Sequence, residues 1–257
     1  VAYSAYFMVY RGDTLAQFLR NVAHIPVNLG VEIGHMWFIY MLLGLYMLVP
    51  IISPWLEQCS KRQLQGYLGV WAFTTLLPYI HLWFPEVWGE CFWNPTPMLH
   101  YFTGFVGYFL LGYYIKRYGA LSVRNALLLL VGGYLFTVAV YQYRLDRVTS
   151  ISDLEICWRF CSMNMMLMTY AFFSLVSRVK WQGNNAFGRW ISSYAMLSYA
   201  VYFVHIMLIN FWRDLLSESL AHVYYQIPII TLCSFLSSYA VVWILSKLPK
   251  AKVWLGS

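Results

Sequence analysis

The sequence predicts an all-α protein, a polytopic transmembrane helix bundle, and three observations lead to this fold class. Hydrophobic residues make up 61% of the 257 residues and charged residues 11%, whereas soluble domains have about 45–50% and about 25%. Seven apolar runs are long enough to cross a bilayer as helices. These runs are continuous rather than alternating, which favours helices over the strands of a membrane barrel.

The seven predicted full spans follow one another along the chain, separated by loops. Each has enough residues to cross a hydrocarbon core of about 30 Å at about 1.5 Å per residue if its edges reach the headgroups. Pro78 and Pro228 are expected to kink or end their helices, and Gly132 and Gly133 to allow close helix packing. The spans are residues 35–52, 65–84, 99–115, 125–143, 156–177, 192–212 and 226–246.

Residues 1–10 are predicted to be the outer end of an eighth span. They are apolar up to Arg11, but ten residues are too few to cross a bilayer, and the chain begins with Val1 rather than Met. No signal peptide, soluble domain or internal repeat is visible in the sequence. We therefore expect a single membrane domain over residues 1–257 that continues upstream of the first residue.

Basic residues are distributed unevenly between the two ends of the predicted spans. Segments 53–64, 116–124, 178–191 and 247–257 carry eleven Lys and Arg, and the segments at the opposite ends carry five. The positive-inside rule places the richer side, and with it the C-terminus, in the cytoplasm. The net charge of +7 then reflects membrane topology rather than a nucleic-acid partner.

Histidines gather where the predicted spans approach the outer side. His35 opens the first full span beside Trp37, and His205 lies about two-thirds of the way out along the sixth. Ser198, Tyr202 and His205 are spaced i, i+4 and i+7, which puts them on one helix face. These histidines are candidates for chemistry, and the alternative is a neutral histidine that packs against a neighbouring helix.

Two further polar features lie on the outer side. Arg159 is the one strong charge placed inside a predicted span, where it either snorkels to the interface or holds an anionic group. The outer loop at residues 85–95 combines two Trp with two Glu. Aromatic faces and carboxylates together suit a sugar, and interfacial anchoring is the alternative.

Three stretches in order carry a resemblance to a known family. They are His35-x-Trp37-Phe38 followed by Tyr46 and Pro50, the glycine- and tyrosine-rich residues 104–119, and residues 198–205. The chain resembles, over essentially its whole length, the acyltransferase 3 family of integral-membrane O-acyltransferases, which includes bacterial enzymes that acetylate surface polysaccharides. The resemblance implies ten membrane helices with both ends in the cytoplasm, so the first two to three are expected to lie upstream.

One hallmark of that family is not found in the chain. The family has an Arg followed eleven residues later by a His in its first helix, but Val22 and Val31 stand at that spacing after Arg11 and Arg20. The resemblance places this motif upstream. The histidine most often assigned as catalytic is therefore expected outside these residues, and the chain by itself is expected to be incomplete as an enzyme.

The resemblance implies transfer of an acyl group, expected to be acetyl, from cytoplasmic acyl-CoA to a sugar or cell-surface polysaccharide hydroxyl at a bacterial inner membrane. The upstream histidine is then the main base, and His35 and His205 are the catalytic candidates here. Candidates for substrate binding are Trp37, Tyr40, Tyr46, Ser198, Tyr202 and Arg159. Candidates for binding the phosphates of CoA are four basic residues on the inner side: Lys61, Arg62, Lys116 and Arg117.

No tightly bound cofactor and no metal are expected. The five cysteines show no CxxC pair and no zinc-ligand spacing, which favours free thiols. Two other classes of function stay open. A flippase or transporter of a lipid-linked saccharide would have a similar cavity, although inverted repeats are not visible. In a structural or sensing membrane protein every histidine would be a packing residue.

Overall fold

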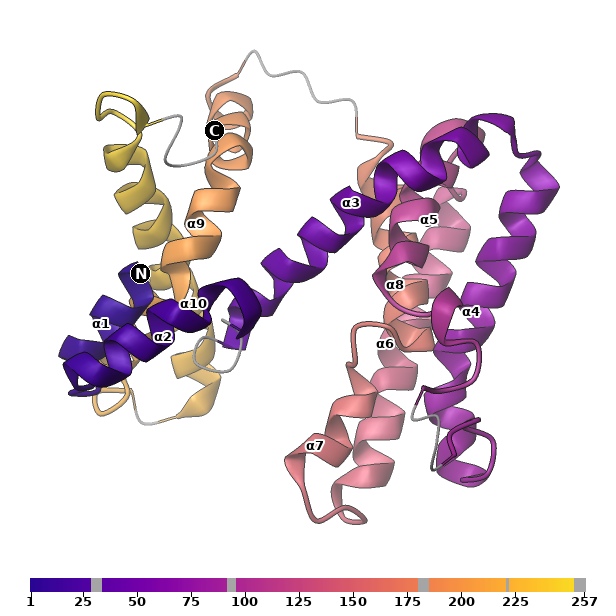
Figure 1. Cartoon of the computed structure of the whole chain (residues 1–257), viewed down its shortest axis with the longest axis horizontal. Helices are drawn as coiled ribbons and strands as arrows, with labels where there is room; N and C mark the ends of the chain where they lie inside the picture. The colour runs from indigo at the N-terminus through magenta and orange to yellow at the C-terminus, as the bar shows by residue number, and fades with distance from the viewer. Residues whose placement is uncertain (29–33, 92–95, 180–184, 221, 252–257) are drawn as a thin grey trace. The chain divides into compact units, whose positions relative to one another are not determined.

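The computed structural model describes residues 1–28, 34–91, 96–179, 185–220 and 222–251, which form helices joined by loops without a strand (Figure 1). The predicted all-α class is confirmed for these residues. The helices fall into two units. The terminal unit combines Val1–Ala23 with Trp181–Ser257, and the central unit is His24–Lys180. The predicted single domain stays a prediction.

The central unit contains most of the helices. Its α4 begins with a capping box, in which the Ser60 hydroxyl accepts from the backbone N–H of Gln63 and the Gln63 side chain bonds back to the Ser60 N–H. α4 packs against α5 and α8, and α6 packs along α8 (Figure 1). The elements are η1 (Gly34–Met36), α3 (Trp37–Gln58), α4 (Lys61–Trp83), η2 (His100–Phe102), α5 (Phe105–Tyr118), α6 (Val123–Leu145), α7 (Ile151–Leu154), η3 (Glu155–Cys157) and α8 (Met163–Val176).

Two glycines let helices of the central unit approach closely. The indole of Trp71 on α4 is 1% exposed and lies against Gly107 on α5, and its Nε1 donates to the Gly104 carbonyl at 3.0 Å. A Cβ on Gly107 would overlap this indole. On α6 a Cβ on Gly133 would meet Met168 Cγ of α8 at 2.5 Å, whereas Gly132 has open space. Close packing, predicted for both glycines, is therefore present at Gly133.

A buried amide joins three elements of the central unit. Asn164, fully buried at the start of α8, accepts from the Tyr79 hydroxyl of α4 at 2.8 Å. Its Nδ2 donates to Thr137 Oγ1 of α6 at 2.7 Å and to the Cys157 carbonyl at 2.6 Å. Because its polar atoms are satisfied, this network holds α4, α6 and η3 in register rather than forming a vacant polar site.

The terminal unit contains α1 (Ala2–Tyr10), α9 (Ala186–Leu216) and α10 (Val223–Leu245), and α2 (Leu15–Asn28) runs from it into the central unit. α9 and α10 pack against each other and diverge toward the C-terminal end of α10 (Figure 1). Leu197, Ala200 and Val201 of α9 pack with Val242 of α10 as the core of this pair. The Tyr10 hydroxyl of α1 donates to Asp214, which also pairs with Arg213 at 3.2 Å, so α1 is tied to the end of α9.

Four helical segments of the described residues are long and apolar enough to cross a membrane: Gly34–Gln58, Val123–Leu145, Ala186–Leu216 and Val223–Leu245. This supports an integral membrane protein, but the predicted count of seven full spans is not confirmed. The predicted spans 99–115 and 156–177 contain helices of only 14 residues, α5 and α8. A 14-residue helix is about 21 Å long, shorter than the hydrocarbon core of about 30 Å.

The backbone explains why those two helices start late. Leu99 and Gly104 have positive φ angles of 58° and 83°, so the chain turns twice before α5 begins at Phe105. Before α8 the chain forms η3 and then an irregular segment up to Ser162. In contrast, Pro78 and Pro228 lie inside α4 and α10 and end neither helix.

Candidate functional site

A cavity of about 350 Å³ lies between α9 and α10 in the terminal unit. Three α9 residues that the sequence predicts on one helix face, Ser198, Tyr202 and His205, line it together. The shared face is present, while the roles of the three residues stay predictions. The remaining lining is apolar or aromatic on α9 and rich in hydroxyl groups on α10: Tyr194, Val201, Ile209, Thr231, Ser234, Phe235 and Ser238.

The contacts of His205 fix which ring nitrogen carries the proton. Nδ1 lies 2.7 Å from the backbone carbonyl oxygen of Tyr202. A carbonyl oxygen only accepts hydrogen bonds, so Nδ1 is the donor, and in the neutral imidazole Nε2 then carries the lone pair. The ring also packs against the Tyr202 ring, with centroids 5.6 Å apart. The imidazole is thus held in the tautomer that acts as a base through Nε2.

Two serines on the opposite wall were missed by the sequence reasoning. Ser234 and Ser238 are 4% and 0% exposed, and their hydroxyls have no hydrogen-bond partner within the described part of the chain. Buried hydroxyls without partners are uncommon and costly, because each loses its bonds to water. Their i, i+4 spacing within the last predicted span was the available signal, because it places both on one face of α10.

The predicted site residues on α3 and just before it belong to the central unit, and Trp37 and Tyr40 have contacts within that unit. The Trp37 ring lies 5.4 Å from Phe105 and 5.3 Å from Phe160, centroid to centroid. The Tyr40 hydroxyl donates to the Ile25 carbonyl. His35 lies in η1, and Tyr46 is 61% exposed on α3. A cavity that has these residues on one wall and His205 on another stays a prediction.

The sequence predicted Arg159 inside a membrane span, but the structure places it outside the helices. It lies between η3 and α8 and is exposed, because α8 begins only at Met163. Its side chain lines a cavity of about 250 Å³ with His81, Trp88 and Arg144. The outer loop at 85–95, predicted to suit a sugar, is described only up to Cys91, and Trp93 lies outside the described residues.

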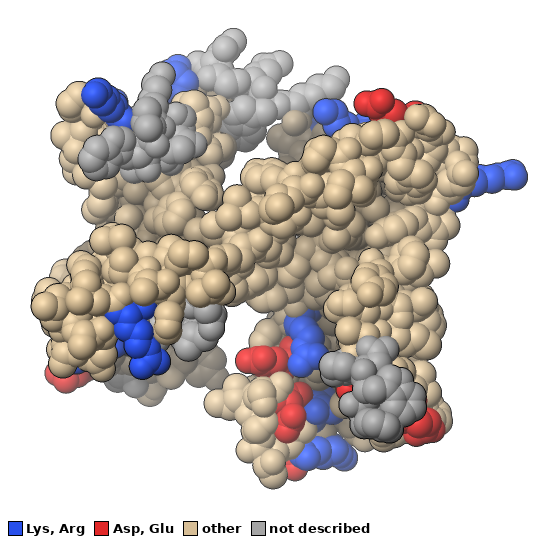
Figure 2. Space-filling view, in the orientation of Figure 1, with Lys and Arg blue, Asp and Glu red and all other residues tan. Residues whose placement is uncertain are grey.

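The four predicted cations at the other end of the central unit differ in what they contact. Arg117 donates to the Leu56 carbonyl at 2.7 Å and to the Tyr113 hydroxyl at 2.6 Å, so it caps the end of α3. Lys61 lies 5.4 Å from the centre of the Tyr118 ring, and Arg62 is exposed. Figure 2 shows basic side chains around the turn between α3 and α4.

Lys116, in contrast, lines a cavity of about 700 Å³ between α5 and α8. A second cation, Arg178, lines the same cavity and donates to the Ala120 and Leu121 carbonyls at 3.1 Å and 2.6 Å. Arg178 was counted as a topology signal and was not predicted as a site residue. Its position 62 residues along the chain from Lys116 gave no signal of this proximity.

The comparisons with known proteins give one match. A family model described as an acyltransferase domain, that of the acyltransferase 3 family, matches residues 1–247. No curated protein and no solved structure matches the chain. The matched range contains both the α9–α10 cavity and every residue predicted as part of a site.

Proposed function

The chain belongs to the acyltransferase 3 family, whose members are membrane acyltransferases, and we propose that it transfers an acyl group from acyl-CoA to a hydroxyl of a sugar or cell-surface polysaccharide. The acyl group is expected to be acetyl and the membrane a bacterial inner membrane. The observation that carries the proposal is the α9–α10 cavity, in which an oriented imidazole faces a wall of hydroxyl groups.

The proposed reaction needs a base, because a sugar hydroxyl is a poor nucleophile near neutral pH. The hydroxyl oxygen forms an ester bond with the acyl carbon, the thioester C–S bond breaks, and the hydroxyl proton passes through a histidine to the departing CoA thiolate. His205 is the base or hydrogen-bond acceptor at Nε2 within this chain, and His35 is kept as the second candidate.

The unpartnered serines support a hydroxylated acceptor. A ligand with several hydroxyl groups supplies hydrogen-bond partners for Ser234 and Ser238, which relieves the cost of burying them alone. Aromatic rings at the cavity, from Tyr194, Tyr202 and Phe235, offer faces for the C–H surfaces of a sugar.

Replacing both Ser234 and Ser238 with Ala tests this assignment in the complete protein. We expect the KM for the sugar acceptor to rise about tenfold, since each lost hydrogen bond contributes about 0.5–1.5 kcal/mol. The thermal stability is expected to hold or increase, because two unpaired polar groups leave the helix interface. Ser246→Ala, at the exposed end of α10, is the control. An unchanged acceptor KM with altered stability would make the serines structural.

For the acyl donor we propose the cavity of Lys116 and Arg178. The phosphates of CoA need cations at their binding site, and these two line one cavity of sufficient size. The guanidinium of Arg117 is already bound to the end of α3, which makes Lys116 the stronger of the predicted pair. Lys61, Arg62 and Arg117 stay predictions.

Charge reversal at Lys116 is the corresponding test. We expect Lys116→Glu to raise the KM for acetyl-CoA about 10- to 150-fold, because a hydrogen bond to a charged group contributes about 1.5–3 kcal/mol. The kcat is expected to change little, because the phosphates bind equally in the ground and transition states. Arg124→Glu, an exposed cation near the start of α6, is the control. Equal donor KM values for both variants would remove Lys116 from the donor site.

A further inference from the structure

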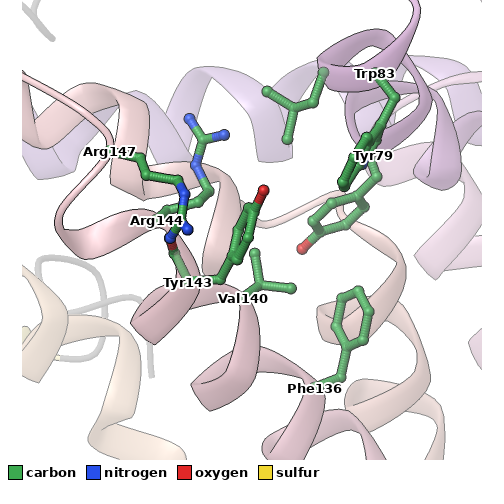
Figure 3. A pocket seen from close by; sticks show the side chains of 8 residues that line it. Tyr79, Trp83, Phe136, Val140, Tyr143, Arg144 and Arg147 are labelled. Carbon is green, nitrogen blue, oxygen red and sulfur yellow. The ribbon is translucent and has the colours of Figure 1, made fainter.

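A second ligand-sized cavity lies in the central unit between α4 and α6, away from the residues assigned to either substrate. It has a volume of about 390 Å³. Tyr79 and Trp83 form its α4 side, and Phe136, Val140 and Tyr143 form its α6 side (Figure 3). Arg144 and Arg147 line it on the α6 side as well. The cavity is therefore apolar and aromatic along most of its length, with two cations at the end of α6.

Among the residues that the structure describes, neither arginine has a carboxylate partner. Arg144 donates to the Asp153 carbonyl at 3.0 Å, and Arg147 donates to the Tyr143 carbonyl at 2.6 Å while lying 4.1 Å from the centre of the Tyr143 ring. Each guanidinium has five N–H donors, so donors remain for a ligand. Figure 2 shows acidic side chains near α7. Within the described residues they form no ion pair with these arginines, and the ion pair present there is the one between Arg213 and Asp214.

The adjoining cavity brings a further arginine and one carboxylate close to Arg144. The cavity of about 250 Å³ shares Leu82 and Arg144 with the first, and its other titratable lining residues are Arg159, His81 and Asp153. The Nδ1 atom of His81 is buried and has no hydrogen-bond partner among the residues that the structure describes. Three arginines, an imidazole and one carboxylate thus lie at the polar end of a largely apolar cavity, and the arginines outnumber the carboxylate.

The depth of these groups matches the profile of a bilayer leaflet. Phe136 and Arg144 are eight residues apart on α6, about 12 Å along the helix. Trp83 and Tyr143, with rings stacked 6.5 Å apart, are 70% and 51% exposed next to the arginines. Exposed Trp and Tyr mark the level of the headgroups, and Phe136 and Val140 then lie at the level of the acyl chains.

We propose that this cavity binds an anionic phospholipid, with the phosphate at Arg144 and Arg147 and an acyl chain between α4 and α6. Guanidinium groups bind phosphate oxygens through paired hydrogen bonds. The apolar length of the cavity favours a lipid over a small soluble anion, because a soluble anion would leave the walls of Phe136 and Val140 uncovered. The site differs from those assigned above to acyl-CoA and to the sugar, so it does not depend on the proposed function.

Lipid binding by the complete protein in detergent, followed by native mass spectrometry, tests this proposal. The probes are phosphatidylglycerol, phosphatidylcholine with the same chains, and glycerol phosphate. We expect phosphatidylglycerol to bind most tightly and glycerol phosphate roughly 100-fold more weakly, because it has no chains to bury. Equal affinity for the two lipids, or equal affinity for glycerol phosphate and phosphatidylglycerol, would overturn the proposal.

Variants separate the charged end from the apolar end. Replacing Arg144 and Arg147 with Gln is expected to weaken phosphatidylglycerol binding about 25-fold, since each basic residue near anionic lipid contributes about fivefold. Replacing both with Lys should keep most of the preference, and Val140→Trp should weaken lipid binding by filling the cavity. Arg213→Gln, at an ion-paired arginine, is the control. Unchanged phosphatidylglycerol affinity in a folded Gln variant would contradict the assignment.

Discussion

Replacing His205 with Asn in the complete protein is expected to lower the kcat of acyl transfer about 10²- to 10⁴-fold, the range of a lost general base. The Asn side chain puts an N–H donor near the position of Nδ1 and keeps the hydrogen bond to the Tyr202 carbonyl. It has no counterpart of Nε2. The helix contacts of residue 205 are therefore kept while the basic nitrogen is removed.

The design separates catalysis from packing. His222, exposed at the N-cap of α10, gives the matched control His222→Asn, for which no loss of rate is expected. Thermal stability is measured for both variants. If His205→Asn transfers acyl groups at the rate of the unaltered protein, His205 is a packing residue and the α9–α10 cavity has no basic group.

Replacing Gly107 with Ala is expected to destabilise the central unit strongly. The new methyl group would overlap the indole of Trp71, which is 1% exposed and tied to the Gly104 carbonyl, so the ring has no room to move. Overpacking costs about 1–3 kcal/mol, and more where the neighbour is rigid. This is a large part of a typical stability of about 5–15 kcal/mol.

Gly112→Ala on the same helix is the control, because a Cβ there meets nothing within 4 Å. It is expected to be neutral or stabilising by up to about 1 kcal/mol, the difference in helix propensity. The measurement is the melting temperature and the monodisperse fraction in detergent. Equal melting temperatures for the two variants would show that α4 and α5 do not pack as described.

Helix periodicity made part of the site predictable. Ser198, Tyr202 and His205 lie within one helix, so their common face follows from their spacing, and the structure places all three at one cavity. The opposite wall was not predictable in this way. Ser234 and Ser238 line the same cavity as His205 because α9 packs on α10, and such helix pairing depends on side-chain shape rather than on local pattern.

Hydropathy identified helices but not where they begin. It counts apolar residues and does not register the positive φ angles of Leu99 and Gly104, which delay α5. For the same reason it placed Arg159 inside a span, although α8 begins at Met163. The charge count likewise treated Arg117 and Arg178 as equivalent, whereas only Arg178 lines a cavity with Lys116.

Transfer of a labelled acetyl group is the direct test of whether the protein is an acyltransferase. The complete protein in detergent is incubated with acetyl-CoA labelled in the acetyl group, with and without a sugar acceptor, and both CoA release and labelled ester are measured. The proposed acyl transfer predicts acceptor-dependent CoA release matched by ester on the sugar. If neither product forms and the same protein moves a lipid-linked saccharide across vesicle membranes, acyl transfer is contradicted and a transporter is favoured.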